Sequence, residues 1–428
     1  MTQQKTAPIK SQQPDRNSEE KKFSKKPFIF AGAGVLLVAA AVCALLFSVS
    51  TSNNSGSEIN TPTTPPDPEI TEMNAKYLFV GTTFWGRRTN QNARASELGV
   101  KYPFSQLDTL ERNRYQAWIG GLECPVTDKG HNYSEEEKIF KFNCDPDYLP
   151  EAAKYFTAFL LGNNHAGNQG LEGLRTTRKY LDEYNIQYFG TPKRTGNDRN
   201  DPEYANDESD INNCSVLVLP VVATLDNGKT EEMKFPFGFC SAHGVYGVPG
   251  DDYQQNVKTY AEVLPTIVMP HMGAEYKTSH DQLRQNIYRR FIDLGADAVI
   301  ADHPHTVQDT EAYKGKLITY SLGNFMFDQT ANNEVPRSAA IEANITISAD
   351  SSDLEAWNAL GEKCLKDKST CFEKIQAAKL DKPTIKYSYD YHATTSAGNR
   401  ITRLADQADQ TSIGQRLNWP TTLAGLDK

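Results

Sequence analysis

The sequence predicts an α/β protein in which strands alternate with helices along the chain. Two stretches, 170–184 and 280–294, show the three- and four-residue spacing of apolar side chains that is typical of helices. Several strands end in polar, glycine-rich turns, where open α/β sheets place their ligands. Short runs rich in β-branched and aromatic residues surround these helices, and they predict strands at 76–81, 117–123, 156–164, 186–190, 215–223, 266–273, 297–303, 316–324 and 339–348.

Composition limits the class of protein. The 428 residues include 45 Lys plus Arg against 54 Asp plus Glu, a net charge of -9, whereas nucleic-acid binders usually carry a basic surplus. Only 38% of residues are hydrophobic, and Pro and Gly number 22 and 28, so part of the chain is expected to be linker or tail. Wholesale disorder and a multi-span membrane protein are excluded, and no nucleic-acid partner is expected.

One apolar run, residues 28–49, contains 22 residues without a charge. As a helix it would be about 33 Å long, enough to cross a bilayer. The basic stretch 1–27 before it predicts a cytoplasmic N-terminus and an extracytoplasmic main domain, held by a single-pass anchor in the cell membrane. The alternative is a cleavable signal peptide that ends near Ser48 or Ser50.

The remaining chain divides by composition. Residues 50–73 are rich in Ser, Thr and Pro and predict a linker, 74–348 form the folded domain, and 349–428 form a C-terminal extension of unknown role with a short helix within 354–378. Residues 193–213 are polar and predict a surface excursion. Six cysteines follow the apolar run, an even number that permits three disulfides, with Cys364 and Cys371 the easiest local pair.

The candidate site residues all lie at the ends of predicted strands or directly after them. Imidazole nitrogens bind Zn, Mn or Fe, and carboxylate and amide oxygens complete such sites, so the joint placement at strand ends favours one shared metal site. For each histidine, the competing interpretation is a core residue satisfied by hydrogen bonds, and we adopt it for His131, His243, His280 and His392. For Glu123, the competing interpretation is a solvated carboxylate in a turn. The candidates are Glu123, Asn164, His165, His271, His303 and His305.

The segments GGLECPVTD, LLGNNHAGNQGLEGL, PHMGAEY, GADAVIADHPHTVQ and ITYSLGNFMFDQ, spread over residues 77–329, resemble the CapA-type poly-γ-glutamate capsule synthesis proteins of the calcineurin-like metallophosphoesterase superfamily. The resemblance implies a four-layer α/β/β/α sandwich with a two-metal or degenerate metal centre. It implies the following roles: a metal-bridging carboxylate for Glu123, an amide ligand for Asn164, a phosphate contact or general acid for His165, and histidine ligands for His271, His303 and His305.

One departure from this family pattern concerns residue 82. The family usually carries Gly-Asp at the end of the first strand, whereas this chain has Gly81 and Thr82. A threonine oxygen is a poorer ligand than a carboxylate, so we expect a single or weakly bound divalent ion. Nearby Arg87 and Arg88 are candidates to hold a phosphate or carboxylate of the substrate, and the alternative for both is a solvated loop.

Three functions agree with these residues. The favoured one is a membrane-anchored component of poly-γ-glutamate synthesis or export that contacts an anionic polymer and membrane-embedded capsule synthesis proteins. The second is a metal-dependent phosphoesterase or other hydrolase unrelated to capsule, in which the ion activates water and His165 protonates the leaving group. The third is an anchored binding domain that kept the fold and lost the chemistry. Whether the chain is an enzyme is left open.

Overall fold

The computed structural model of the chain describes residues 67–190, 214–245 and 250–427, and within these ranges fourteen strands join one mixed sheet. This confirms the predicted α/β class. The predicted basic tail (1–27), the anchor (28–49) and most of the predicted linker (50–73) lie outside the described residues, as does the whole of the predicted excursion at 193–213. Among the helices that are described, none is both long and apolar enough to cross a membrane.

Strand β1 (Ile70–Thr83) is the centre of the sheet. It pairs antiparallel with β12 (Arg337–Ser348) and β5 (Cys214–Leu225), and parallel with β2 (Ala117–Leu122) and β11 (Asn324–Met326). Because side chains alternate across a strand, Tyr77 and Phe79 enter one apolar core while Leu78 and Val80 enter another. The strand that carries Thr82 is therefore buried on both faces.

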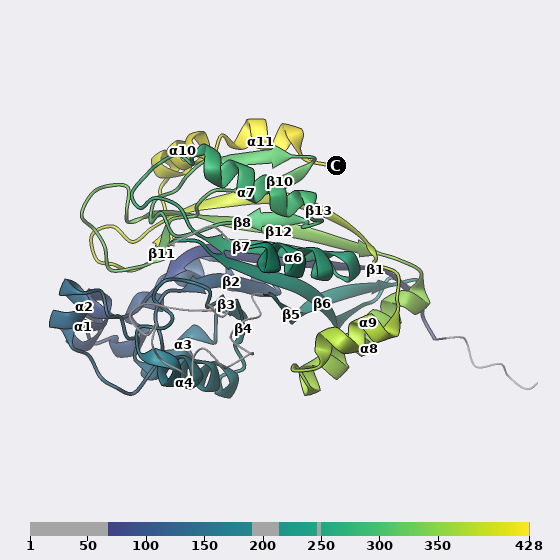
Figure 1. The fold of residues 1–428 in the computed structure, drawn as a ribbon, viewed down its shortest axis with the longest axis horizontal. Coiled ribbons are helices and arrows are strands. Elements are labelled where there is room, and N and C mark those ends of the chain that lie inside the picture. Colours follow the sequence, from purple (N-terminus) through teal and green to yellow (C-terminus); the bar gives the residue numbers. More distant parts are fainter. Residues whose placement is uncertain (1–66, 191–213, 246–249, 428) are drawn as a thin grey trace, which may run out of the picture. The chain divides into compact units, whose positions relative to one another are not determined.

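One branch of the sheet runs from β1 through β2 and β3 (Ala158–Leu160) to β4 (Gln187–Phe189), with all strands parallel. Helix α4 (Gly170–Glu183) connects β3 to β4, as its apolar spacing predicts. The core on this side is rich in aromatic rings, including Trp85, Trp118 and Phe156. Figure 1 shows α4 near α1 (Arg87–Ala95), α2 (Tyr133–Lys138) and α3 (Leu149–Ala152) on this side of the sheet. Short 3-10 turns fill the connections at Gly99–Phe104, Leu107–Leu110, Arg112–Arg114 and Pro146–Tyr148.

The other branch begins with the long antiparallel pair β5 and β6 (Thr230–His243). Strands β7 (Thr266–His271), β8 (Ala298–Ile300) and β10 (Lys316–Thr319) then follow parallel to β6, and β9 (Thr310–Tyr313) closes the edge. The connections contain α6 (Asp251–Val263) and α7 (Gln282–Asp293), the second of which was predicted.

The C-terminal segment continues this sheet. Strand β13 (Thr384–Thr395) pairs with β12 along its whole length, and β14 (Arg403–Leu404) pairs with β13. Four helices accompany these strands: α8 (Ser351–Lys366), α9 (Cys371–Ala378), α10 (Gln407–Arg416) and α11 (Trp419–Gly425). The boundary expected at residue 348 therefore falls inside a continuous sheet.

Three disulfides join the six cysteines that follow the apolar run. They are Cys124–Cys144, Cys214–Cys240 and Cys364–Cys371, so the local pair favoured by the sequence is present. The first bears directly on the site, because Cys124 follows the candidate ligand Glu123. This bond fixes the turn after β2 to the loop that contains Phe142.

Candidate metal centre

The candidate ligands lie at the carboxyl ends of neighbouring strands. Glu123 directly follows β2, and His271 is the last residue of β7. Asn164 and His165 follow β3, and the loop with His303 and His305 follows β8. Because parallel strands end at the same edge of a sheet, positions far apart in the sequence meet there.

Glu123 is the centre of this group. Its side chain is 1% exposed, and its Oε1 lies 3.8 Å from the Nε2 atoms of His165 and His305 and 3.9 Å from Nε2 of His271. Neither carboxylate oxygen accepts a hydrogen bond. Burial of a carboxylate without a donor is costly. The separations are below about 4.2 Å, twice a typical metal–ligand bond, so a cation between these atoms would satisfy them.

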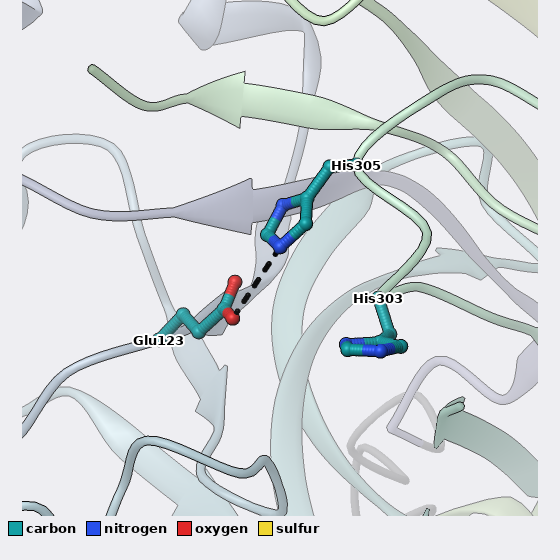
Figure 2. Close-up of side chains that lie close together, drawn as sticks. All are labelled: Glu123, His303 and His305. Atoms are coloured by element: carbon teal, nitrogen blue, oxygen red, sulfur yellow. Dashed lines mark ion pairs between the residues drawn. The ribbon is translucent and has the colours of Figure 1, made fainter. Parts of the chain in front are cut away.

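His303 and His305 meet Glu123 from one loop. Ligand atoms of these three buried residues all lie within 4.8 Å of one another, and Figure 2 shows the rings of His303 and His305 on the side of the loop that faces Glu123. The backbone φ angles of His303 and His305 are 108° and 58°, a region that non-glycine residues rarely adopt. Such backbone strain is concentrated at functional sites.

His271 contacts both Asn164 and His303 on another side of the group. Nε2 of His271 lies 2.9 Å from Oδ1 of Asn164 and 3.1 Å from Nδ1 of His303. About 3 Å is also the spacing of two neighbouring ligands on one cation. The six predicted residues are thus brought together around a common point, and their nitrogen and oxygen atoms suit a Zn, Mn or Fe ion.

Amide side chains orient two of the rings. Nδ1 of His305 donates to Oδ1 of Asn324 at 2.8 Å, and Nδ1 of His165 donates to Oδ1 of Asn168 at 2.9 Å. Each bond places the hydrogen on Nδ1 and leaves the Nε2 lone pair directed at Glu123. Metal-ligating histidines usually have such a partner on the other nitrogen.

Burial keeps the four imidazoles neutral, which is the form that binds metal ions. It lowers the pKa of His165 to about 3 and that of His305 to about 4. Burial is also the largest cause of the strongly lowered pKa of His271 and His303, and the neighbouring imidazoles lower both values further. Protonation at neutral pH therefore does not compete with an ion for these nitrogens.

Two buried carboxylates, Glu123 and Asp302, have a raised pKa. Burial raises the pKa of Glu123, and the negative charge of Asp302 adds to the rise. The pKa of Asp302 is raised to about 7, mainly by burial, although the Thr82 hydroxyl that donates to its Oδ2 opposes the shift. Asp302 was not among the residues predicted from the sequence. Its place in ADHPH, between an apolar strand and the two histidines, was the available signal.

His165 connects this group to a cleft of about 540 Å³. Its ring stacks on Phe142, with centroids 4.0 Å apart, and its side chain is 14% exposed. Lys129, Lys141 and Glu275 also line the cleft, as do Asn164 and His305. The centre is therefore accessible to a substrate from this side.

The two arginines are placed differently from the candidate ligands. The Arg87 side chain is buried and donates to both oxygens of Asp328, at 3.0 and 2.5 Å. Its guanidinium lies 4.4 Å from the Phe142 ring centroid. Arg88 is exposed and pairs with Glu137 at 3.3 Å. Both arginines border a second cleft of about 640 Å³, but the Arg87 guanidinium already has a carboxylate partner within the protein.

Three of the four histidines set aside as structural have partners away from the centre. Nδ1 of His131 lies 2.8 Å from Glu136, Nδ1 of His280 lies 2.8 Å from Asp309, and Nε2 of His392 lies 3.1 Å from the Tyr115 hydroxyl. His243 differs, because it ends β6 in register with His271 and contributes to the lowered pKa of that ring. The sequence did not indicate this proximity.

Comparisons of the chain with a family profile and with known proteins agree on one family. The sequence profile of a family described as "Bacterial capsule synthesis protein PGA_cap" matches residues 76–329. The "PGA biosynthesis protein CapA" of Bacillus subtilis (strain 168) is 26% identical over 253 residues, which are 59% of this chain and 63% of that protein. The "Capsule biosynthesis protein CapA" of Bacillus anthracis is 26% identical over 253 residues, 59% of each chain. This chain thus spans about three fifths of the length of these curated relatives. A crystal structure of TT1561 of Thermus thermophilus matches 63% of this chain and 93% of that chain at 10% identity, with a TM-score of 0.30, from which we draw no argument.

Proposed function

Because the chain belongs to the PGA_cap family of bacterial capsule synthesis proteins, we propose that it acts in the synthesis or export of a capsule polymer of the poly-γ-glutamate type. The matched region, 76–329, contains every residue of the candidate metal centre. Two relatives of the chain are named for PGA or capsule biosynthesis. The proposal assigns the same process to this protein and places its chemistry at the strand-end centre.

The observation that carries the chemical part of the proposal is the environment of Glu123. Its Oε1 lies within 3.9 Å of three imidazole nitrogens and has no hydrogen-bond partner. We propose that Glu123, His303 and His305 hold a divalent ion of the Zn, Mn or Fe type, with Asn164 and His271 beside them. Such an ion polarises a phosphoryl or carbonyl oxygen and lowers the pKa of a nearby water molecule.

His165 has a separate role in this proposal. Its ring is fixed by Phe142 and Asn168, and its Nε2 lone pair is free to accept a proton from a substrate hydroxyl or water in the cleft. A pKa near 3 keeps the ring unprotonated at neutral pH. A ring that is unprotonated at neutral pH does not begin as the proton donor that the family resemblance implies.

The lining of the cleft supports an anionic substrate. Lys129 and Lys141 lie on its wall, although the chain as a whole carries a net charge of -9. Attraction of a polymer that bears carboxylate or phosphate groups would therefore depend on these local lysines rather than on the overall charge. The polymer itself is the proposed ligand.

We also propose that the domain faces the outside of the cell membrane, anchored through residues 28–49 beside membrane-embedded capsule synthesis proteins. The apolar run and the basic stretch before it support this orientation. The three disulfides agree with an oxidising compartment. For the fold, we propose the four-layer α/β/β/α sandwich that the family resemblance implies, and the burial of β1 on both faces agrees with it.

Complementation of a deletion strain tests this proposal. The gene is deleted and surface polymer is quantified in cells that carry the wild-type chain, Glu123→Gln or the matched control Glu355→Gln, which changes an exposed carboxylate on α8. Wild type and control should restore the polymer, and Glu123→Gln should not. An unchanged polymer level in the deletion strain would reject the capsule role. Full restoration by Glu123→Gln at equal protein abundance would reject the role of the centre.

A hydrolase unrelated to capsule is the second candidate, and the cleft beside His165 favours it. The purified full chain is assayed with a model phosphodiester in the presence of Mn²⁺ or Zn²⁺. Hydrolysis that is lost in both His271→Ala and His303→Ala would support this function. Hydrolysis that survives both changes would exclude the centre as its source. An ion that binds without any hydrolysis would leave the chain as an anchored binding domain.

A further inference from the structure

A second buried carboxylate lies beside the strand-end centre, at Asp302. The residue follows β8, directly before His303, and is 4% exposed. Its Oδ2 accepts a hydrogen bond from the Thr82 hydroxyl at 2.5 Å. Its other oxygen, Oδ1, is buried and has no well-aligned hydrogen-bond donor, although the nearby backbone amide of His303 slightly lowers the pKa of the carboxyl. Asp302 therefore has one oxygen fixed by the protein and one that still lacks a partner.

This carboxylate occupies the space at the end of the Thr82 side chain. Thr82 lies near the carboxyl end of β1, opposite Gly121 of β2. The space is open on that side because Gly121 has no side chain, and a Cβ there would lie 3.4 Å from Oδ2 of Asp302. An aspartate at position 82 would reach about one bond beyond the threonine oxygen. Asp302 thus brings a carboxylate to the end of the Thr82 side chain from the segment that follows β8.

The charges around the two acids favour the binding of a cation. Glu123 and Asp302 are both buried, and each has at least one oxygen without a partner. In the described part of the chain, neither acid forms an ion pair with a lysine or arginine; the ion-pair distances of Glu123 are all to histidines. Burial of two ionised carboxylates among neutral imidazoles is costly in free energy, and a bound divalent cation would offset that cost.

We propose that Asp302 is the second anionic ligand of the metal centre, and that Thr82 orients it by donating a hydrogen bond. The inference rests on the proposed centre, and it changes the expectation from the sequence. The loss of the family aspartate at position 82 does not leave the centre short of one negative charge, because Asp302 supplies it. Asp302 lies outside the compact group formed by Glu123, His303 and His305, and in this proposal it binds the ion from the side of the centre where it contacts Thr82.

The test moves the carboxylate from position 302 to position 82 and measures Mn²⁺ binding by the full chain. Affinity is measured by titration calorimetry on the metal-free protein, with total metal checked by elemental analysis. Asp302→Asn should weaken Mn²⁺ binding at least tenfold, and Thr82→Val should weaken it less, because the carboxylate remains. The double variant Thr82→Asp with Asp302→Asn should regain most of the affinity. Asp390→Asn, an exposed carboxylate on β13, is the matched control and should bind as wild type does.

The outcomes separate this inference from the proposed function. If the wild-type chain binds neither Mn²⁺ nor Zn²⁺, the metal centre itself is wrong. If wild type binds and Asp302→Asn binds equally well, the centre stands and Asp302 is not a ligand. The double variant can keep the wild-type melting temperature without metal and still not regain affinity for Mn²⁺. That result would show that a carboxylate at position 82 does not replace the one at position 302. Circular dichroism of each metal-free variant identifies any change that fails to fold.

Discussion

Two buried acidic regions of the molecule contrast in how their charges are satisfied. Asp328 and its partner Arg87 are 4% and 5% exposed, and the carboxylate accepts two bonds from the guanidinium. Glu123 and Asp302 are 1% and 4% exposed, yet each leaves at least one oxygen without a donor. The three carboxylates are buried to a similar degree, but among the described residues only Asp328 of the three pairs with a cationic side chain, that of Arg87. The comparison indicates that the first region is structural and that the second is built to bind.

The structural region also supports the binding region. The Arg87 guanidinium lies over the rings of Phe84, Phe142 and Phe327, at 5.2, 4.4 and 5.6 Å from their centroids. Phe142 in turn stacks on the ring of His165. The buried ion pair therefore fixes the aromatic side chain against which the candidate proton acceptor rests.

The largest effect is expected from breaking the ion pair. Arg87→Met leaves Asp328 buried without a counter-charge and should lower the free energy of unfolding by about 3–5 kcal/mol, measured by urea denaturation of the full chain. The double change Arg87→Met with Asp328→Leu should recover most of this loss, because neither charge remains. Glu123→Gln, by contrast, should leave the metal-free protein at least as stable as wild type. A loss below about 1 kcal/mol for Arg87→Met would show that the two regions do not differ in this way.

The next largest effect on stability is expected from the binding of a divalent ion. At a free Mn²⁺ or Zn²⁺ concentration of 100 times the dissociation constant, binding should stabilise the wild-type chain by about 2.7 kcal/mol, and a chelator should reverse the gain. The melting temperature should rise in wild type and in the Glu355→Gln control but not in Glu123→Gln. An equal rise in Glu123→Gln would mean that the ion binds elsewhere.

A smaller effect is expected from pH in the metal-free protein. The pKa of Asp302 is raised to about 7, so between about pH 4 and pH 7 the folded state holds a proton that the unfolded state has lost. This contribution to stability falls as pH rises through that window. His165 and His305 act in the opposite direction below about pH 6.5, because the unfolded chain protonates first.

Comparison of two proteins isolates the carboxylate from the histidines. The melting temperature of Asp302→Asn minus that of wild type should grow by a few degrees from pH 4 to pH 7 and then stay constant. The histidine contributions are common to both proteins and cancel in the difference. A difference that does not change with pH would contradict a raised pKa at Asp302.

The sequence predicted the alternating strands and the location of the centre, because both depend on local patterns. It missed β6, whose first turn-proximal residues include Glu231 and Glu232, and it missed β13. Strand β13 carries Tyr387, Tyr389 and Tyr391 at every second position, a strand pattern that the polar composition of the segment concealed.

In the candidate site, too, only features that depend on local patterns could be predicted. The strand-end histidines were predictable because each follows its own apolar run. The contact of Thr82 with Asp302 joins residues 220 positions apart, and the Arg87–Asp328 pair joins residues 241 apart. No local pattern indicates which side of a loop either carboxylate occupies, so its partner could not be inferred from one sequence.

The smallest effect is expected one residue along the chain from Arg87. Arg88 pairs with Glu137 at 3.3 Å, but the two side chains are 55% and 46% exposed, so water screens the pair. Arg88→Gln should change the free energy of unfolding by less than about 0.5 kcal/mol in the same urea experiment. Because Arg88 borders the second cleft, the same variant tests whether its exposed guanidinium holds an anion. Weaker binding of an anionic polymer with unchanged stability would assign Arg88 to recognition. A loss of stability similar to that of Arg87→Met would show that burial does not distinguish the two arginines.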